Sequence, residues 1–285
     1  RLSECSKGVQ HGQPDRHSPE IQARCIIWLL CYTPTTARIT ITGGTNMTTQ
    51  GYARPEMLAD TDWLAEHIDD PNIRIIDCDE FPEYRRSHIK NAVGVQVHHY
   101  IKHPDYPKDS HAYPWVAEPD VIKELMEKLG IGDDTLVVTY DANGSLSAAR
   151  FWWVLNYYGH TNVKVLNGGW RKWHDEGKPT SIDRPPVVSV TFTPNANEDL
   201  ICTLDYGVGQ VGHSDTVFLD VRADGEWDGS NSRGNERVGH IPGAVHLEWT
   251  NFLNEDRHRT FKTAEELRSM LEMIGVTADK NVITY

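Results

Sequence analysis

The chain has 285 residues, of which 39% are hydrophobic, so it is long enough to form about two domains with apolar cores. Its formal net charge of −13 argues against nucleic acid or an anionic membrane as the main partner, because both require a basic surface. No apolar run approaches the roughly 20 residues that span a bilayer. The longest run is CIIWLLCY, residues 25–32. We therefore expect a globular, cytoplasmic protein.

Residues 1–46 differ from the rest of the chain. They contain Cys5, Cys25 and Cys31, and they show no amphipathic period. We interpret Met47 as the start of translation and the preceding residues as a reading frame extended upstream; the alternative is a disordered or cleaved leader. In both cases we expect residues 1–46 to pack on nothing, because ordering them would cost entropy without burial in return.

Residues 55–177 alternate predicted helices and strands joined by short loops. This order predicts a parallel sheet covered by helices on both faces. We take Thr61 or Asp62 as the cap of the first helix, and Gly130 and Gly159 as the ends of two later helices. The predicted elements are a helix at 61–68, strands at 73–78 and 92–97, a helix at 118–130, a strand at 135–140, a helix at 147–159 and a strand at 163–169.

Residues 178–199 are rich in proline and lack a helical period, which is typical of a linker between domains. A second unit then covers residues 200–285. Its helix at 263–275 begins with Thr263 and has Glu266 three residues later, the pattern of a capping box. The remaining predicted elements are strands at 216–221, 243–249 and 281–285.

The second unit repeats the first. Residues 125–140 match residues 270–285 without a gap, and RIIDCDEFPEY matches VFLDVRADGEW. SHIKNAVGV matches GHIPGAVHL, after the insertion GSNSRGNER in the second copy. The second copy ends where the first turns from a strand into a loop and a helix. We therefore predict two tandem units, the second lacking roughly 40 residues of the pattern.

The duplication, the GHIPGA motif after an LDVR strand end and the LNGGWRKW motif resemble the two-domain rhodaneses, the thiosulfate and 3-mercaptopyruvate sulfurtransferases. The resemblance covers residues 47–285, although Lys90 and Asn91 replace the Pro-Gly of the motif in the first copy. It implies that a cysteine thiolate accepts a sulfane sulfur from a small anionic donor as a persulfide and passes it to cyanide or a thiol. It also implies a monomer that needs no metal or organic cofactor.

The resemblance places the nucleophile at the position after Tyr285, so we expect this chain to be an inactive fragment of a sulfurtransferase. Asp141 occupies the equivalent position in the first unit, which implies that this unit is the inactive copy. A carboxylate cannot carry a persulfide. We interpret Asp141 as a capping residue whose side chain binds the backbone of its own loop, ahead of the next helix.

Two arginines are the candidate residues for binding the donor. The resemblance assigns Arg222 and Arg237 to this role, and a planar guanidinium suits a sulfonate or a carboxylate. For Arg222 the alternative is a surface ion pair with Asp224 or Glu226.

The other conspicuous residues have structural interpretations. We expect His88 and His240 to be hydrogen-bonded near strand starts, Cys78 to be a packed thiol, and the tryptophans to be core. Besides the sulfurtransferase, a non-catalytic rhodanese-like binding or regulatory module and a rhodanese-fold phosphatase remain open. The residue after Tyr285 decides between the first two, and the phosphatase would need a longer loop after its cysteine.

Overall fold

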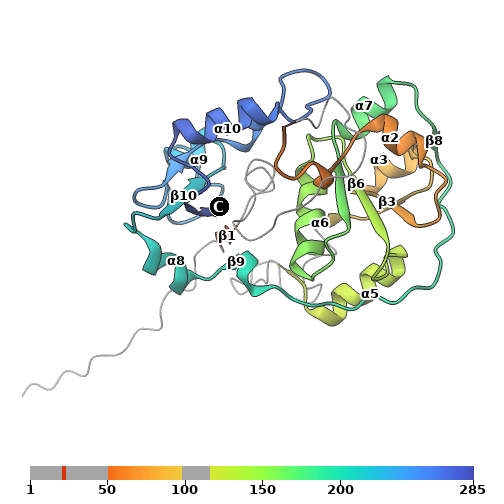
Figure 1. Cartoon of the computed structure of the whole chain (residues 1–285), viewed down its shortest axis with the longest axis horizontal. Helices are drawn as coiled ribbons and strands as arrows, with labels where there is room; N and C mark the ends of the chain where they lie inside the picture. The colour runs from red at the N-terminus through yellow and green to blue at the C-terminus, as the bar shows by residue number, and fades with distance from the viewer. Residues whose placement is uncertain (1–20, 24–50, 98–115) are drawn as a thin grey trace, which may run out of the picture.

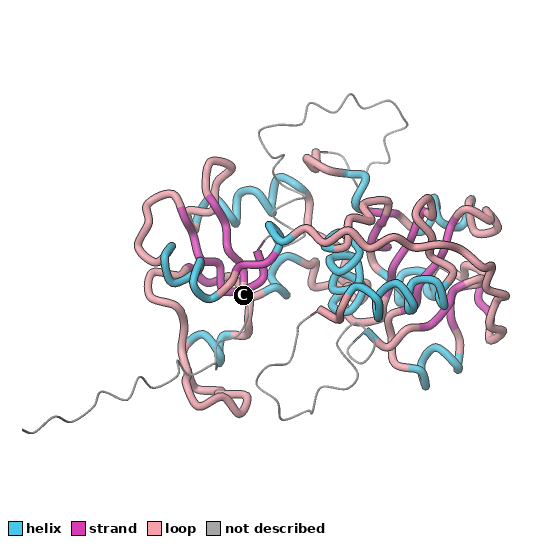
Figure 2. Tube along the Cα trace, turned by 90° about the horizontal axis from the view of Figure 1, so that it is seen from below, coloured by secondary structure: helices cyan, strands magenta, loops and turns pink. Residues whose placement is uncertain are grey.

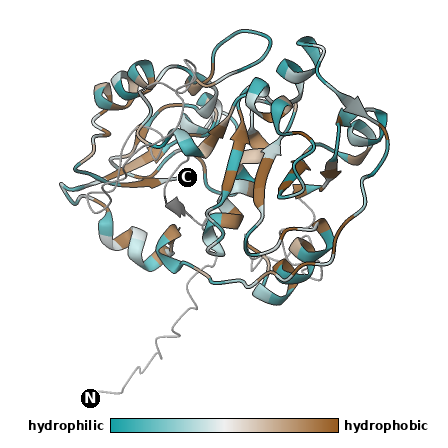
Figure 3. Ribbon diagram, turned by 45° about the vertical axis from the view of Figure 1, so that its right-hand side comes forward, coloured by the Kyte–Doolittle hydropathy of each residue, from teal (hydrophilic) through white to brown (hydrophobic). Residues whose placement is uncertain are grey.

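The computed structural model describes residues 21–23, 51–97 and 116–285 (Figure 1). Two groups of strands, each flanked by helices, form the two domains (Figure 2). Strands of both domains are largely hydrophobic, as the brown ribbons in Figure 3 show. Among the described residues, no helix is long and apolar enough to cross a membrane.

The first domain is built on a five-stranded parallel sheet. Its strands lie in the order β2-β7-β6-β3-β5. Successive residues of a strand point to opposite faces, so Ile75 and Ile76 enter different apolar clusters. The strands are β2 (Leu58–Ala59), β3 (Ile73–Asp77), β5 (Ala92–Gly94), β6 (Leu136–Tyr140) and β7 (Val163–Leu166).

Helices cover both faces of this sheet, as the sequence predicts. The helices α5 and α6 pack in the apolar cluster of Ile76, and α2 and α7 pack with Ile75. The helices of this domain are α2 (Thr61–Glu66), α3 (Phe81–Arg86), α5 (Pro119–Leu129), α6 (Leu146–Tyr157) and α7 (Gly169–Asp175).

The helix ends follow the predicted signals with one exception. Gly130 caps α5 in the left-handed conformation, and Thr263 and Glu266 form the predicted capping box. The cap of α2 is Asp60, whose side chain accepts a hydrogen bond of 2.7 Å from the Trp63 N–H. The prediction of Thr61 or Asp62 is therefore wrong by one or two residues, because three consecutive residues can all serve as caps and only one has the extended backbone.

Part of the predicted linker packs on the first domain. Strand β8 (Thr180–Ser181) pairs antiparallel with β4 (His88–Ile89). Further along, Phe192 is buried, and the Thr193 N–H donates to Asp133 over 2.7 Å. The segment between the domains therefore runs along the first domain and is tied to it.

The second sheet has the order β11-β10-β12-β1-β9. Strands β11 and β12 lie parallel to β10, as the repeat predicts. The strands are β9 (Ile201–Cys202), β10 (Thr216–Asp220), β11 (Val245–His246) and β12 (Asn281–Thr284); the helices are α8 (Leu204–Gln210), α9 (Asp224–Trp227) and α10 (Ala264–Met273). The predicted strand at 243–249 is thus only two residues long.

Strand β1 (Ile21–Ala23) corrects an expectation about residues 1–46. It lies between β12 and β9 and pairs antiparallel with both, so this part of the leader does pack on the domain. Our expectation considered side-chain periodicity, whereas pairing uses main-chain groups that every residue except proline carries. Residues 1–20 and 24–46 lie outside the described residues.

The two domains share one continuous apolar cluster. Trp152 and Trp153 of α6 belong to it together with Phe252 and Leu267 of the second domain. Both tryptophans are buried, which agrees with the packing role expected for them. The contact brings the amino-terminal end of α6 close to the second domain, where Leu253 lies against Gly144.

Candidate functional site

The candidate site lies at the carboxyl ends of β10 and β12 in the second domain. Ligands of open α/β sheets bind at this edge. Asp220 is the last residue of β10 and is fully buried. Tyr285 follows β12, and its backbone pairs with Leu219 and Val221 across the strand ends.

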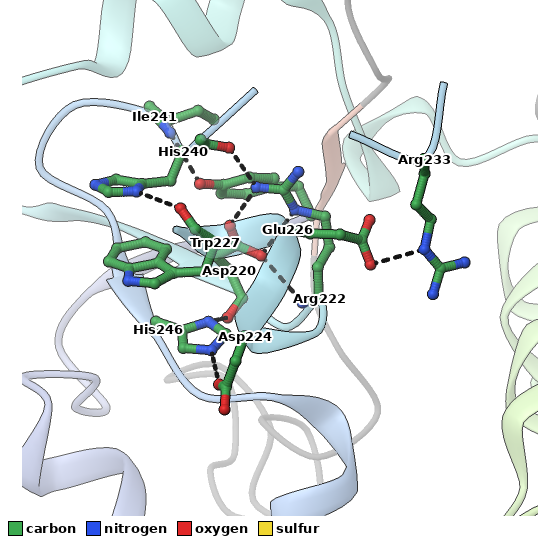
Figure 4. A network of polar contacts seen from close by, with 11 residues as sticks. Asp220, Arg222, Asp224, Glu226, Trp227, Arg233, His240, Ile241 and His246 are labelled. Carbon is green, nitrogen blue, oxygen red and sulfur yellow. Dashed lines mark hydrogen bonds and ion pairs between the residues drawn. The ribbon is translucent and has the colours of Figure 1, made fainter. Parts of the chain in front are cut away.

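Arg222 is fixed against Asp220 (Figure 4). Its Nε donates to Oδ1 over 2.9 Å and its Nη2 donates to Oδ2 over 2.5 Å. Nη2 also donates to the Gly239 carbonyl over 2.9 Å, and the guanidinium lies 5.0 Å from the centroid of the Tyr285 ring. Asp220 raises the pKa of Arg222, so the side chain stays charged. Within the described part of the chain, the Nη1 donors have no hydrogen-bond partner.

This geometry differs from the ion-pair interpretation of Arg222. The ion-pair partner is Asp220, and neither Asp224 nor Glu226 takes that place. Glu226 pairs instead with Arg233 over 3.0 Å. The other candidate, Arg237, is exposed and has no hydrogen bond or ion pair to any described residue. Both arginines stay candidate donor-binding residues.

An aromatic stack supports the turn beside Arg222. The Trp227 ring lies between His240, at 3.5 Å between centroids, and His246, at 5.0 Å. His240 Nδ1 lies 3.0 Å from the Trp227 carbonyl oxygen, and His246 Nε2 lies 2.9 Å from an Asp224 carboxylate oxygen. The stack holds the turn in which the Ile241 N–H donates to the Tyr285 hydroxyl over 3.0 Å. His240 is therefore in a structural environment, as expected, although it is exposed.

The first domain repeats these contacts with other residues. The Ile89 N–H donates to the Tyr140 hydroxyl over 3.0 Å, as Ile241 does to Tyr285. Tyr140 donates to the buried Asp77 over 2.5 Å, and the Tyr84 ring stacks on His88 at 4.1 Å. The repeat found in the sequence thus extends to side-chain contacts, and it makes Tyr140 and Tyr285 structurally equivalent.

The two edges differ in the sign of their charge. Asp79 stands where the second domain has Arg222, and its carboxylate accepts from the Ala142 N–H over 3.0 Å. Burial raises the pKa of Asp79 to about 7 and that of Asp77 to about 6. Between them Cys78 is buried, and burial raises the pKa of its thiol as well. A buried thiol beside carboxylates is a poor nucleophile.

Asp141 fills an anion-binding loop with its own carboxylate. Oδ1 accepts from the N–H groups of Asn143 and Ser145 over 2.8 and 2.9 Å. Oδ2 accepts from Ser147 and Ala148 over 2.8 and 2.9 Å, at the amino-terminal end of α6. These bonds agree with the predicted capping role, and they saturate a loop that could otherwise bind an anion.

The second domain contacts this loop, where Leu253 and Arg259 lie against Gly144. The Phe261 N–H donates to the Asn167 side chain over 2.9 Å in a buried contact, and Arg257 and His258 both lie 3.1 Å from Asp175. Asp141 is only 2% exposed. The loop of the first domain consequently lies beside the interface, and the carboxylate at its centre is buried.

The described residues include no group of three His, Cys, Asp or Glu side chains that could hold a metal ion. Cys78 and Cys202 are free and buried, and burial raises the pKa of Cys202 too. Cys5, Cys25 and Cys31 lie outside the described residues.

Sequence reasoning missed three contributors to the site. It did not foresee that Asp220 fixes Arg222, that Trp227 stacks between two histidines, or that Asn167 binds the second domain. The alignment of Trp227 with Tyr84 was a usable signal for the stack, because both rings precede an aligned histidine. Asn167 offered no signal, since its partner comes from a distant part of the chain.

Known proteins resemble this chain in sequence and in structure across both domains. Residues 60–176 and 208–285 match the rhodanese-like domain family. The sulfur carrier protein TtuD of Thermus thermophilus is 34% identical over 250 residues, which cover 82% of this chain and 84% of TtuD. A putative thiosulfate sulfurtransferase of Mycolicibacterium smegmatis is 28% identical over 242 residues, 82% of this chain and 83% of the relative. The crystal structure of SseA from Escherichia coli, a 3-mercaptopyruvate sulfotransferase, matches with a TM-score of 0.70 and 26% identity, covering 80% of this chain and 87% of SseA. The chain therefore belongs to the rhodanese family and carries two rhodanese-like domains in tandem.

Proposed function

We propose that this chain is the main body of a sulfurtransferase that moves a sulfane sulfur from thiosulfate or 3-mercaptopyruvate to a thiol or cyanide. The nucleophile is a cysteine at the position that follows Tyr285. The observation that carries this proposal is the equivalence of Tyr285 and Tyr140, whose hydroxyls accept the same backbone hydrogen bond at matching strand ends. The residue after Tyr140 is Asp141, which lies in a loop of four backbone donors.

A thiolate in such a loop is suited to the chemistry. Backbone N–H groups and a helix amino terminus lower the pKa of a cysteine and stabilise the negative charge of a persulfide. With thiosulfate, the thiolate attacks the outer sulfur, the S–S bond of the donor breaks, and sulfite leaves with the electron pair. An acceptor thiolate or cyanide then attacks the terminal sulfur of the persulfide, and the cysteine thiolate is regenerated.

Arg222 and Arg237 bind the anionic donor in this proposal. Arg222 lies at the strand edge, its charge is maintained by Asp220, and two Nη1 donors remain for an anion. Arg237 is exposed on the segment that leads to His240. The corresponding edge of the first domain has Asp79 in place of Arg222, so it lacks this cation, and Asp141 already fills its loop.

The proposal is tested by the codon that follows Tyr285 and by assays of the protein with and without the following residues. Residues 1–285, incubated with thiosulfate and cyanide, should form no thiocyanate above the buffer rate, and no cysteine should gain the mass of one sulfur. The protein that continues beyond Tyr285 should form a persulfide on the next residue. A residue other than cysteine at that position would leave a non-catalytic rhodanese-like binding or regulatory module as the function.

A further inference from the structure

Residues 167–175, which contain the LNGGWRKW motif except for its leucine, border the loop of Asp141. The Trp170 N–H donates to the Asp141 carbonyl over 3.0 Å. Gly169 has a φ of +51°, and a side chain there would collide with the same carbonyl oxygen, so this close approach requires a glycine. The motif therefore packs directly against the backbone of the loop in the first domain.

The same segment contacts the second domain at both of its ends. Asn167 precedes α7, and its side-chain oxygen accepts the Phe261 N–H over 2.9 Å in a buried contact. Asp175 is the last residue of α7, and its carboxylate lies 3.1 Å from both Arg257 and His258. All three partners come from the loop that precedes α10, and this loop reaches toward α7 (Figure 1).

That loop is a hairpin whose ends are joined. Leu253 and Phe261 form an antiparallel bridge. The Lys262 N–H donates to the Phe252 carbonyl over 3.0 Å, and the Lys262 Nζ donates to the Leu253 carbonyl over 2.8 Å. We call residues 253–262 the docking hairpin. Because its two arms are bonded to each other, a displacement at its tip is passed on to its base.

The base of the docking hairpin adjoins the candidate site. It follows the short helix η4 (Trp249–Phe252), whose first N–H donates to the Val221 carbonyl over 3.0 Å. Just before η4, the Leu247 N–H donates to the Asp220 carbonyl over 3.0 Å. These two bonds hold the end of β10, where the Asp220 side chain fixes Arg222. One turn of helix therefore separates the docking hairpin from the groups that hold this strand end.

We propose that Asn167 and Asp175 are positioning residues that act through the docking hairpin on the end of β10, and thereby on Arg222. The buried Phe261 N–H needs an acceptor, and Asn167 supplies it across the domain interface. The alternative is that these contacts only attach one domain to the other. In that case, releasing the hairpin would leave the end of β10 unchanged. The coupling concerns the geometry of this strand end and does not depend on whether Arg222 binds a sulfur donor.

Amide exchange in the full chain separates the two possibilities. The Asp175 side chain is 23% exposed, so Asp175→Ala removes its contacts without opening a cavity in either core. The amides of Leu247 and Trp249 should then exchange at least about tenfold faster than in the unsubstituted chain, as nuclear magnetic resonance would show. The amides of residues 137–140 and 268–273 should keep their rates, which shows that both domains remain folded.

Asp69→Ala is the matched control. The Asp69 carboxylate also has two partners, Lys90 and Asn91, but both belong to the first domain. This variant should leave the exchange of Leu247 and Trp249 unchanged. A similar acceleration in both variants would indicate general destabilisation and would overturn the proposal.

A second pair of variants tests the buried contact. Asn167→Leu removes the acceptor of the Phe261 N–H, whereas Asn167→Asp keeps an acceptor oxygen in the same place. Only the leucine variant should accelerate the exchange of the two amides that pair with the end of β10 and shift the resonance of the Arg222 Nε–H. If the leucine variant failed to fold, the exchange rates of Asp175→Ala would decide.

One result would refute the coupling. In either variant with a folded first domain, the Phe261 amide would exchange faster while the amides of Leu247 and Trp249 and the Arg222 Nε–H stayed unchanged. The hairpin would then be released without an effect on β10, and its contacts would serve only to attach the domains.

Discussion

Replacing Asp141 by asparagine tests whether the stability of the first domain depends on the carboxylate that the backbone of its loop binds. The carboxylate accepts four backbone hydrogen bonds, two on each oxygen. An asparagine offers one oxygen, and its NH₂ group would face two N–H donors that it cannot satisfy. The variant should therefore lose two of the four bonds while keeping nearly the same volume.

The expected cost follows from these bonds. Each charge-assisted hydrogen bond contributes about 1.5–3 kcal/mol, so losing two would cost about 3–6 kcal/mol. A neutral amide is easier to bury than a carboxylate, which leaves about 2–4 kcal/mol. This is a large share of the roughly 5–15 kcal/mol that stabilises a typical domain.

Urea unfolding followed by tryptophan fluorescence and circular dichroism measures this loss. Asp133→Asn is the matched control, because this exposed carboxylate accepts two hydrogen bonds from Thr193. The control should lose no more than about 1 kcal/mol. If Asp141→Asn lost no more stability than Asp133→Asn, the loop would not depend on the carboxylate and the capping role would be refuted.

Three further predictions concern the charged groups and the reaction. Burial raises the pKa of Asp79 to about 7, so the folded state keeps its proton longer than the unfolded chain, and stability should fall as pH rises from about 4 to about 7. Asp79→Asn should flatten this dependence by roughly 1–2 kcal/mol after allowance for solvent screening, as urea unfolding at a series of pH values would show. Arg222→Ala should cost about 1–3 kcal/mol in the same assay, because it leaves the buried Asp220 without its cation, whereas Arg233→Ala should cost less than about 1 kcal/mol. Equal costs for the two arginines would contradict the structural role of the Arg222 ion pair. Residues 1–285 should produce no thiocyanate, and turnover that disappears in Cys78→Ser or Cys202→Ser would show that the nucleophile is misplaced.

The sequence predicted the fold well where the signal was local or repeated. Apolar runs such as 135–140 and the Thr263 capping box depend on neighbouring residues, and the structure contains both elements. The duplication predicted two similar sheets, and the matched contacts of Tyr140 and Tyr285 confirm it at the level of side chains.

The sequence could not predict contacts that depend on the tertiary structure. Ile21–Ala23 pair with two strands that are distant in the chain, and no periodic pattern in three residues indicates this pairing. The partner of Arg222 was misjudged for a related reason. Asp220 ends β10 only two residues before Arg222, and side chains two residues apart in extended chain can share a face, but we considered only the acids that follow.

Asp79 in the first domain corresponds to Arg222 in the second, and this difference gives the two strand edges different side-chain chemistry. Both domains keep a buried aspartate and a tyrosine that hold the strand ends in register. In the first domain the corresponding side chain is the carboxyl group of Asp79, and the loop is filled by Asp141. In the second domain the neighbouring charge is basic and part of it remains available to an anion. A cation is therefore present at one edge and a carboxyl group takes its place at the other, although the two edges are built on the same backbone pattern.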